Sequence, residues 1–472
     1  MTSNQIRPTQ TQPTQTEPTQ TQPLVARSLT RRGLLGTGAA LGASVPLISL
    51  GAGSADAAGV GAAATGQHRA SLRAAVEFLQ RATDAYHPSG YRLVQSYQDN
   101  SGLGDIGFIY DNALTSMALL AAGDVARARA IGDALLYAQT HDAEFTDFRL
   151  RQAYHADDFV FPDGNVHFGY EFGLLGTAVG DMAWSGVALA QLARETRQQR
   201  FLVGARRIGQ WIVDNTYSTS GLGGYTFGET ANLEDHKSTE HNIDVYALFR
   251  LLARLTGNPV WRARADHAWA FVESVWNSTA GFFWTGSDDG STINKAAKQL
   301  PLDAQTWAWL AARDRSYAGA LDWAATHLAT TDTPLRPNST LTGNYSVSGV
   351  AFGSGTFLTD TDVRIGNQSF NPKPDPAGVW FEGTAQLALA LRDRKARGDR
   401  AAAEELLGEI RSAQRELGGG QTFGGRSGQG GVVAASSPLD TGFGFGYFPN
   451  LHIGATSWYV FAATSFNPYR FR

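Results

Sequence analysis

A repeated pair of helix-like segments runs through most of the chain and limits the folds that it can adopt. Six apolar segments recur roughly every 60 to 80 residues. They begin at residues 110, 181, 240, 303, 381 and 455. A segment of this kind buries its apolar face only against its neighbours, so the repeat must either close on itself or stack.

Amphipathic segments separate the apolar ones, and their apolar residues recur at intervals of three and four, the period of an α-helix. Alanine-rich composition favours helix over strand, and Pro and Gly cluster between the segments as turns require. We therefore expect outer helices over residues 71–85, 125–139, 199–214, 259–276, 316–328 and 401–417. Paired with the six apolar helices, they predict an all-α chain, an (α/α)6 barrel of six helical hairpins.

Three short phrases at the apolar openings carry a resemblance to a known group of proteins. Residues 238–244, 301–303 and 380–386 read STEHNID, PLD and WFEGTAQ, as in secreted bacterial members of the six-hairpin glycosidase superfamily. With the repeat, the chain resembles this superfamily over about residues 71–469. The resemblance implies an (α/α)6 toroid that acts on carbohydrate. A right-handed solenoid of helix pairs is the alternative, but it repeats at a shorter period and lacks such long loops.

Acidic side chains stand at five of the six openings: Asp111, Asp181, Glu240, Asp303 and Glu382. In a barrel the inner helices run parallel, so these carboxyls would meet at one end. An acid at a helix start, taken alone, is usually a cap or a partner of the helix dipole. Glycosidic hydrolysis needs two carboxyl groups with opposed roles, and crowding in an apolar cleft separates their pKa values. The number of acids therefore predicts a catalytic site.

Glu240 is the candidate general acid. Ser238 and Thr239 directly before it can cap the helix, which leaves the glutamate free for the cleft. His241 and Asp244 follow it and offer hydrogen-bonding partners.

Asp111 and Asp181 are the candidate bases. Asp111 follows the aromatic Tyr110, where a substrate ring could stack. Asp303 and Glu382 are expected to orient the sugar or to tune pKa values. Glu382 is the main rival in this assignment, because it stands at an equally good helix mouth.

Aromatic rings and histidines accompany the acids. Sugar rings have apolar faces that stack on aromatic side chains, whereas tryptophans deeper in the inner helices, such as Trp307 and Trp458, favour core packing. The loops over about residues 334–378 and 418–450 are long enough to wall the cleft. The predicted substrate-binding residues are Tyr110, His167, Trp184, His241, Asp244, Trp284, Asp303, Trp380 and His452.

Other reactions remain open at this point. Toroidal sugar epimerases work through histidines, a polysaccharide lyase would use a tyrosine or histidine base, and a non-catalytic carbohydrate-binding protein would keep the aromatic rings. Neither a His-x-x-x-His nor a Glu-x-x-His spacing occurs on a predicted helix, so the sequence does not indicate a tight metal site, and we expect no cofactor. The acidic loop 287–290 lacks the full ligand spacing of a calcium site.

The first 57 residues are expected to be a targeting segment. A Thr-, Gln- and Pro-rich tail precedes residues 28–35, SLTRRGLL, which match a twin-arginine export signal, and Ala55-Asp56-Ala57 is a cleavage pattern. Residues 58–472 would then be a single secreted domain without a membrane span. The chain has no cysteine, and its net charge of −4 does not favour nucleic acid. We expect a monomer that acts on carbohydrate.

Overall fold

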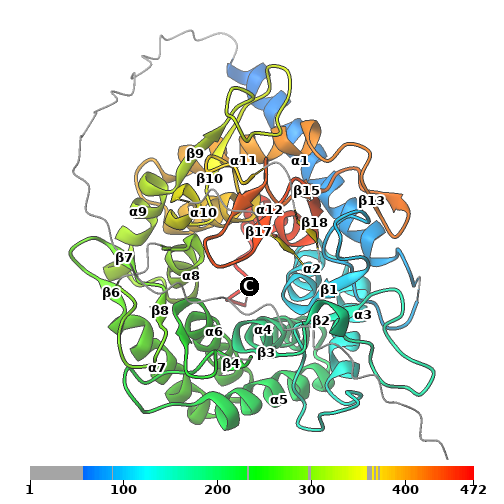
Figure 1. Ribbon diagram of the computed structural model, residues 1–472, viewed down its shortest axis with the longest axis vertical. Helices are drawn as coiled ribbons and strands as arrows, with labels where there is room; N and C mark the ends of the chain where they lie inside the picture. Colours follow the sequence, from blue (N-terminus) through cyan, green and yellow to red (C-terminus); the bar gives the residue numbers. More distant parts are fainter. Residues whose placement is uncertain are drawn as a thin grey trace, which may run out of the picture.

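In the computed structural model, which describes residues 57–471 apart from 88, 231–232, 296–298, 359–363, 366–367 and 370–372, twelve α-helices form two concentric rings (Figure 1). The inner ring is α2 (Ile109–Ala121), α4 (Val179–Thr196), α6 (Thr239–Thr256), α8 (Leu302–Ala312), α10 (Phe381–Arg394) and α12 (Ile453–Thr464). The outer ring is α1 (Ala57–Thr83), α3 (Val125–Ala138), α5 (Gln199–Thr216), α7 (Pro259–Ser274), α9 (Gly319–His327) and α11 (Asp399–Glu416). Each inner helix contacts both of its inner neighbours, and α12 contacts α2, so the ring closes. The predicted (α/α)6 barrel is confirmed.

The helix boundaries follow the sequence pattern closely. All six apolar openings begin inner helices, within two residues of the expected start. One outer helix differs, because α1 begins at Ala57 rather than at residue 71. Another is shorter than expected, since residues 316–328 divide into the short helix η2 (Arg315–Tyr317) and α9. The export signal over residues 1–56 lies outside the described residues.

Burial explains the two kinds of helix. Every residue of α8 from Leu302 to Ala311 is buried, and a helix surrounded on all sides is apolar on all sides. In α5 the buried residues Phe201, Ala205, Ile208 and Ile212 recur at three and four, so one face packs inward and the other meets water. No helix among the described residues is long and apolar enough to cross a membrane.

The loops that enter the inner helices pair with one another in a ring of short strands, which we call the collar. The residue before each inner helix has an extended backbone. This residue, or the short strand that it ends, pairs with the loop that leads into the next inner helix. The collar consists of β1 (Ile106–Phe108) with β2 (Ala153–His155), β3 (Thr177–Ala178) with β4 (Gly228–Glu229), β5 (Lys237–Ser238) with β8 (Gly286–Ser287), and the bridges Pro301–Gly353, Trp380–Ala435 and Tyr97–His452. It fixes the six helix N-termini side by side.

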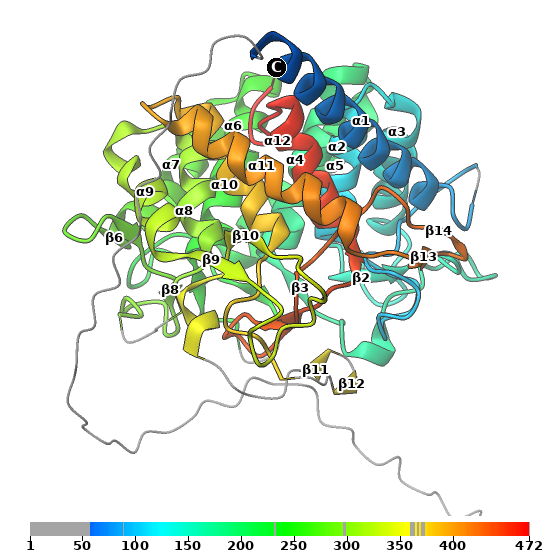
Figure 2. The same ribbon diagram turned by 90° about the horizontal axis from the view of Figure 1, so that it is seen from above.

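The remaining strands belong to the same loops, which cluster at one end of the barrel (Figure 2). All pairs are antiparallel. They are β6 (Trp276–Asn277) with β7 (Phe282–Phe283), β9 (Ala329–Asp332) with β10 (Val347–Val350), β11 (Arg364–Ile365) with β12 (Gln368–Ser369), β13 (Thr422–Phe423) with β14 (Arg426–Ser427), β15 (Val432–Val433) with β18 (Leu451–His452), and β16 (Leu439–Asp440) with β17 (Gly446–Tyr447). Short helices η1 (Tyr170–Phe172) and η3 (Ser354–Leu358) complete them.

The C-terminal tail closes the opposite end of the barrel. After α12, Gln191 of α4 donates to the carbonyl of Pro468 at 2.7 Å, and Asn467 donates to the carbonyl of Leu310 at 2.9 Å. Tyr469 is buried against the central rings and donates to Asp244 Oδ1 at 2.6 Å. The tail therefore forms a floor beneath the inner ring.

Candidate active site

Five carboxyl groups lie at the second or third position of five inner helices, at the collar end of the barrel. The carboxyls of Asp111, Asp303 and Glu382 belong to buried residues, and Asp181 and Glu240 are partly exposed. The parallel arrangement of the inner helices and the collar brings them together, as the sequence pattern led us to expect.

These carboxyls do not cap their helices. Within the described part of the chain, none of the five accepts a hydrogen bond from a backbone N–H. Two of the inner helices are capped by other side chains: Ser238 Oγ accepts from His241 N at 3.4 Å, and His452 Nδ1 accepts from Ala455 N at 3.2 Å. The Ser238 cap is the one predicted from the sequence, and it leaves Glu240 free.

Glu382 has one oxygen that is held and one that is free. Tyr110 Oη donates to Glu382 Oε1 at 2.5 Å, and Trp458 Nε1 donates to Tyr110 Oη at 3.0 Å. Glu382 Oε2 is buried, lies 3.8 Å from His452 Nδ1, and has no hydrogen-bond partner among the described residues. Burial, together with the nearby charge of Asp111, raises the pKa of Glu382 well above its ordinary value, and the Tyr110 hydrogen bond opposes this rise.

Asp111 and His452 form a buried pair. Because His452 Nδ1 accepts from a backbone N–H, we assign its proton to Nε2, which donates to Asp111 Oδ1 at 3.1 Å. Tyr97 stacks on the imidazole at 4.4 Å between ring centres. Gly454 leaves room for the pair, since a Cβ there would lie 2.6 Å from Asp111 Oδ1. Both ring nitrogens of His452 are therefore occupied, and the ring positions Asp111.

Glu240 makes no hydrogen bond to a described residue, and the residue as a whole is partly exposed. Burial and the neighbouring Asp303 raise its pKa well above the ordinary value. Burial likewise raises the pKa of Asp303 to about 7, against a hydrogen bond from the Gln386 side chain. Asp244, one turn deeper on α6, has its pKa raised by burial and is held by Tyr469. Glu240 is thus a carboxyl group whose surroundings favour the protonated form.

Asp181 and His241 lie on neighbouring helices. Burial and the charge of Asp111 raise the pKa of Asp181 to about 7. Burial lowers the pKa of His241 to about 4, so this imidazole is neutral near pH 7. His241 occupies the space over Gly180, where a Cβ would lie 2.5 Å from its Cδ2 atom, and packs on Phe227.

Buried polar atoms without partners lie in the inner ring and in the collar, around the carboxyls. Unpartnered buried donors and acceptors are rare in folded proteins and cost about 1–3 kcal/mol each. Within the described residues they include the indole N–H groups of Trp184, Trp307 and Trp380, His241 Nδ1, and the oxygens Asp244 Oδ2, Asp303 Oδ1 and Glu382 Oε2. Donors and acceptors occur together, which suits a ligand rich in hydroxyl groups.

The side chains of Trp284 and His167 contact residues other than the five carboxyls. Trp284 packs edge-on against Phe282. His167 lies on the rim beside β2, where its ring stacks on His155 at 3.8 Å and contacts Phe161 at 4.3 Å. The structure does not bring these two side chains into contact with the five carboxyls, and their role in binding stays a prediction.

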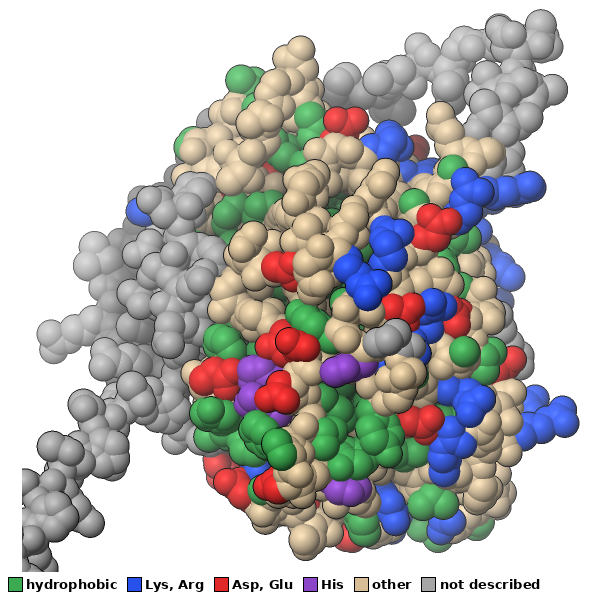
Figure 3. Space-filling model, turned by 90° about the vertical axis from the view of Figure 1, so that its right-hand side faces the viewer, with side chains coloured by type: hydrophobic (Ala, Val, Ile, Leu, Met, Phe, Trp, Pro, Cys, Tyr) green, Lys and Arg blue, Asp and Glu red, His purple; other side chains and the backbone are tan. Residues whose placement is uncertain are grey.

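Among the described residues, His155, His167 and Glu171 offer the one set of three metal-ligating atoms within 4.8 Å. Histidines lie among acidic side chains on the face shown in Figure 3. The two imidazole planes are stacked and differ by only 20°, so one ion cannot lie in the plane of both rings. His155 Nδ1 instead lies 2.8 Å from Asp105, and its Nε2 lies 2.7 Å from Glu171. These two carboxylates raise the pKa of His155 against the effect of burial, which makes the group an ion-pair network.

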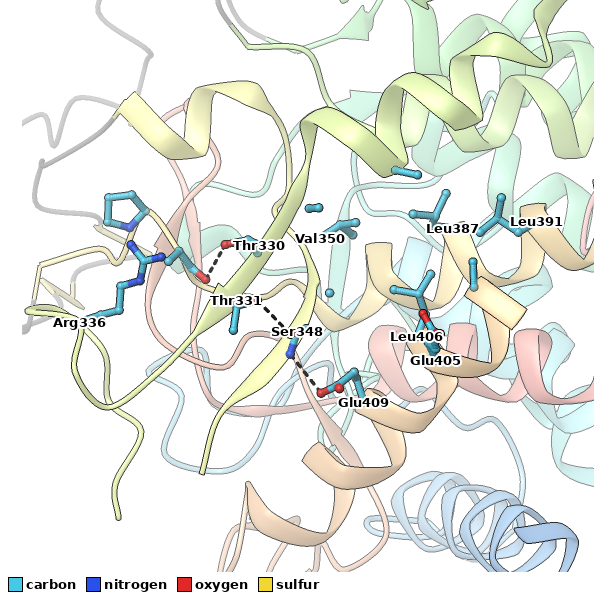
Figure 4. A pocket seen from close by; sticks show the side chains of 16 residues that line it. Thr330, Thr331, Arg336, Ser348, Val350, Leu387, Leu391, Glu405, Leu406 and Glu409 are labelled. Carbon is cyan, nitrogen blue, oxygen red and sulfur yellow. Dashed lines mark hydrogen bonds between the residues drawn. The ribbon is translucent and has the colours of Figure 1, made fainter. Parts of the chain in front are cut away.

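A cavity of about 810 Å³ opens on the outside of the barrel, between the β9–β10 hairpin and helices α10 and α11 (Figure 4). Leu387, Leu391 and Leu406 form its apolar side, and Glu409 accepts a hydrogen bond from Ser348 N at 3.1 Å. Neither an aromatic ring nor any of the five carboxyls lines it. It is separate from the candidate active site.

Several residues at the site could not be assigned from the sequence. Tyr97 and Gln386 contact His452 and the carboxyls, and Tyr447 stacks on Trp380 with ring centres 5.5 Å apart. Tyr469 comes from the chain end. Only Gln386 could have been identified, because it lies one turn after Glu382 on the same helix face.

Stability should depend on pH through the two carboxyls whose pKa is about 7. In the folded chain Asp181 and Asp303 stay protonated up to about pH 7, whereas in the unfolded chain they lose their protons above about pH 4. The free energy of unfolding therefore falls as the pH rises from about 4 towards 7. We expect the melting temperature of the Asp181→Asn/Asp303→Asn variant, relative to the unsubstituted chain, to rise between about pH 5 and about pH 8. Melting curves check it, and a constant difference across this range would contradict it.

Comparison with known proteins supports the fold. No family model matches the chain, and no curated protein matches its sequence. A solved glycosidase variant in complex with glucose aligns with a TM-score of 0.54 at 12% identity, over 85% of this chain and 97% of that one. A D-mannose isomerase aligns with a TM-score of 0.53 at 13% identity, over 84% of this chain and 96% of that one. Cellobiose 2-epimerase from Bacillus thermoamylovorans B4167 aligns with a TM-score of 0.53 at 11% identity, over 83% of this chain and 97% of that one. At these identities the likeness establishes the barrel fold.

Proposed function

We propose that this chain is a glycoside hydrolase in which Glu240 is the general acid and Glu382 is the base or nucleophile. The observation that carries the proposal is the contrast between these two carboxyls. Closely spaced carboxyls in a low-dielectric interior do not all ionise, and the proton stays where the anion is least stabilised. Tyr110 donates to Glu382, whereas Glu240 has no such donor among the described residues. Burial raises the pKa of both carboxyls, and the Tyr110 hydrogen bond opposes this rise only at Glu382, so we assign the proton to Glu240 and the charge to Glu382.

In the reaction, Glu240 would donate its proton to the glycosidic oxygen as the bond to the anomeric carbon breaks. Glu382 Oε2, buried and without a partner among the described residues, would take a proton from the attacking water or attack the anomeric carbon itself. Asp111 and Asp181 were the bases suggested by sequence position. Asp111 is also held by a donor, His452, and Glu382 is the better candidate because its second oxygen, Oε2, is buried without a partner among the described residues.

The unpartnered indole N–H groups and carboxyl oxygens support a sugar as the ligand, because its hydroxyls both donate and accept. The named neighbours act on or bind sugars, which favours the same class of substrate. The test is a panel of oligo- and polysaccharides incubated with residues 58–472 and read by new reducing ends and by NMR of the products. Release of reducing ends supports the proposal, and unsaturated uronide products would replace it with a lyase.

Sugar isomerisation or epimerisation is the second candidate, favoured by two of the structural neighbours. It needs a histidine free to move a proton. Both nitrogens of His452 are occupied, and the pKa of His241 near 4 makes it a weak base, although its Nδ1 has no partner among the described residues. An isomeric sugar without a new reducing end would favour this reaction.

We also propose that the protein is exported by the twin-arginine route. Changing Arg31 and Arg32 to Lys should leave the precursor in the cytoplasm, because the paired arginines are the part of the signal that the export receptor reads. Immunoblots of cell and medium fractions check this result, with Arg27→Lys, just outside the pair, as the control. Normal export of the double variant would contradict the route.

A further inference from the structure

Two exposed aromatic rings stand at the tip of the hairpin formed by β16 and β17. Phe443 and Phe445 are 40% and 42% exposed, although large apolar side chains are usually buried. Single exposed rings are common on protein surfaces and need no explanation. Two exposed rings on one short turn, next to a buried aromatic cluster, instead form a group of the kind that marks binding surfaces. The hairpin belongs to the loop 417–452, and β17 lies close to the centre of the ring (Figure 1).

Hydrogen bonds hold the backbone of the turn that carries both rings. Thr441 N donates to the carbonyl of Phe445 at 3.1 Å, and Thr441 Oγ1 donates to the same carbonyl at 2.7 Å and accepts from Phe443 N at 3.2 Å. Gly442 and Gly444 have φ of +82° and +87°, which side chains rarely adopt. A platform that is ordered before binding loses little entropy on binding.

A row of ring contacts runs from the surface to the carboxyls, because Phe445 lies 5.9 Å from Tyr447 and Tyr447 lies 6.3 Å from His452, the partner of Asp111. Phe352 lies 6.1 Å from both Phe443 and Phe445, and 4.8 Å from Trp380, centre to centre. Trp380 is two residues before Glu382, and its indole N–H is buried without a partner among the described residues. This continuity, rather than exposure alone, identifies what binds: a ligand that also reaches the site.

Resting on the proposed function, we propose that Phe443 and Phe445 bind the sugar units that extend outward from the reacting ring, so that the substrates are oligosaccharides. The apolar faces of successive sugar rings would stack on the two phenyl rings, with Phe352 and Trp380 leading inward. A monosaccharide glycoside would occupy only the interior and would not reach the hairpin.

The test compares short and long sugars on the double variant Phe443→Ala/Phe445→Ala. The probes are maltose with maltotetraose and cellobiose with cellotetraose. For the pair that is hydrolysed, we expect kcat/KM for the tetramer to fall roughly tenfold, mainly through KM, and the value for the dimer to stay within about twofold. Tyr91→Ala, an exposed ring that packs on Tyr137 of α3, is the matched control and should change neither value.

The outcomes separate this inference from the proposed function. Equal losses on dimer and tetramer, or no loss on either, would overturn the hairpin site while leaving the hydrolase intact. If neither pair is hydrolysed, calorimetric titration of the same sugars decides: tetramer binding that weakens roughly tenfold in the double variant supports the site. If the unsubstituted chain neither hydrolyses nor binds a tetramer, the proposal is overturned.

Discussion

Glu240→Gln is expected to lower the rate of hydrolysis by roughly 10²–10⁴-fold, because the amide cannot give a proton to the leaving oxygen. The fold should be unchanged, since Glu240 makes no hydrogen bond to a described residue and the helix is capped by Ser238. Rates and melting temperatures of the variant and of Glu195→Gln, an exposed glutamate on α4, check both statements.

A leaving group that needs no proton gives a sharper form of this test. The dinitrophenolate group of a dinitrophenyl glycoside leaves as a stable anion without being protonated. Loss of the general acid should therefore slow hydrolysis of this glycoside far less than hydrolysis of an ordinary oligosaccharide. Near-normal activity of Glu240→Gln on an oligosaccharide would show that another group supplies the proton.

Glu382→Gln is expected to lower the rate by a similar roughly 10²–10⁴-fold, but on both kinds of glycoside. The reason is that a base or nucleophile acts on the anomeric carbon whatever the leaving group is. Tyr110→Phe removes the hydroxyl that donates to Glu382 Oε1 and should cause a smaller loss. If Glu382→Gln spares dinitrophenyl glycosides while Glu240→Gln does not, the two roles are reversed. If Asp111→Asn or Asp181→Asn alone abolishes activity, the base is there instead.

The fold could be predicted from the sequence because its cause is repetitive. Six apolar helices buried on all sides leave six similar patterns, and the acids recur at the same position in five of them. Periodicity does not reveal partners that lie far apart along the chain. Tyr110 is 272 residues from Glu382, and Asp111 is 341 residues from His452. Ring closure creates both contacts, so the roles of the acids could not be ranked before the barrel was seen.

The position of α1 was predictable only in part for the same reason. Its second half shows the helical period, whereas the first residues are rich in Ala and Gly and carry no clear apolar face. Tyr469 left no signal at all, because it belongs to a tail outside the repeat. Only the structure shows that its hydroxyl donates to Asp244 Oδ1, at 2.6 Å.

The tail that closes the barrel has a consequence for how the protein is made. The first described helix, α1, packs on α12, and the floor is built from residues 467–470, so closing the barrel joins segments that lie far apart along the chain. Contacts of such high sequence separation form late and slow the folding of a chain. The ring therefore cannot close before α12 and residues 467–470 have been synthesised, and until then the earlier hairpins have an open seam. A truncation before Asn467 would remove the floor with its hydrogen bonds from Gln191 and to Leu310, so we expect it to lower the yield of folded protein.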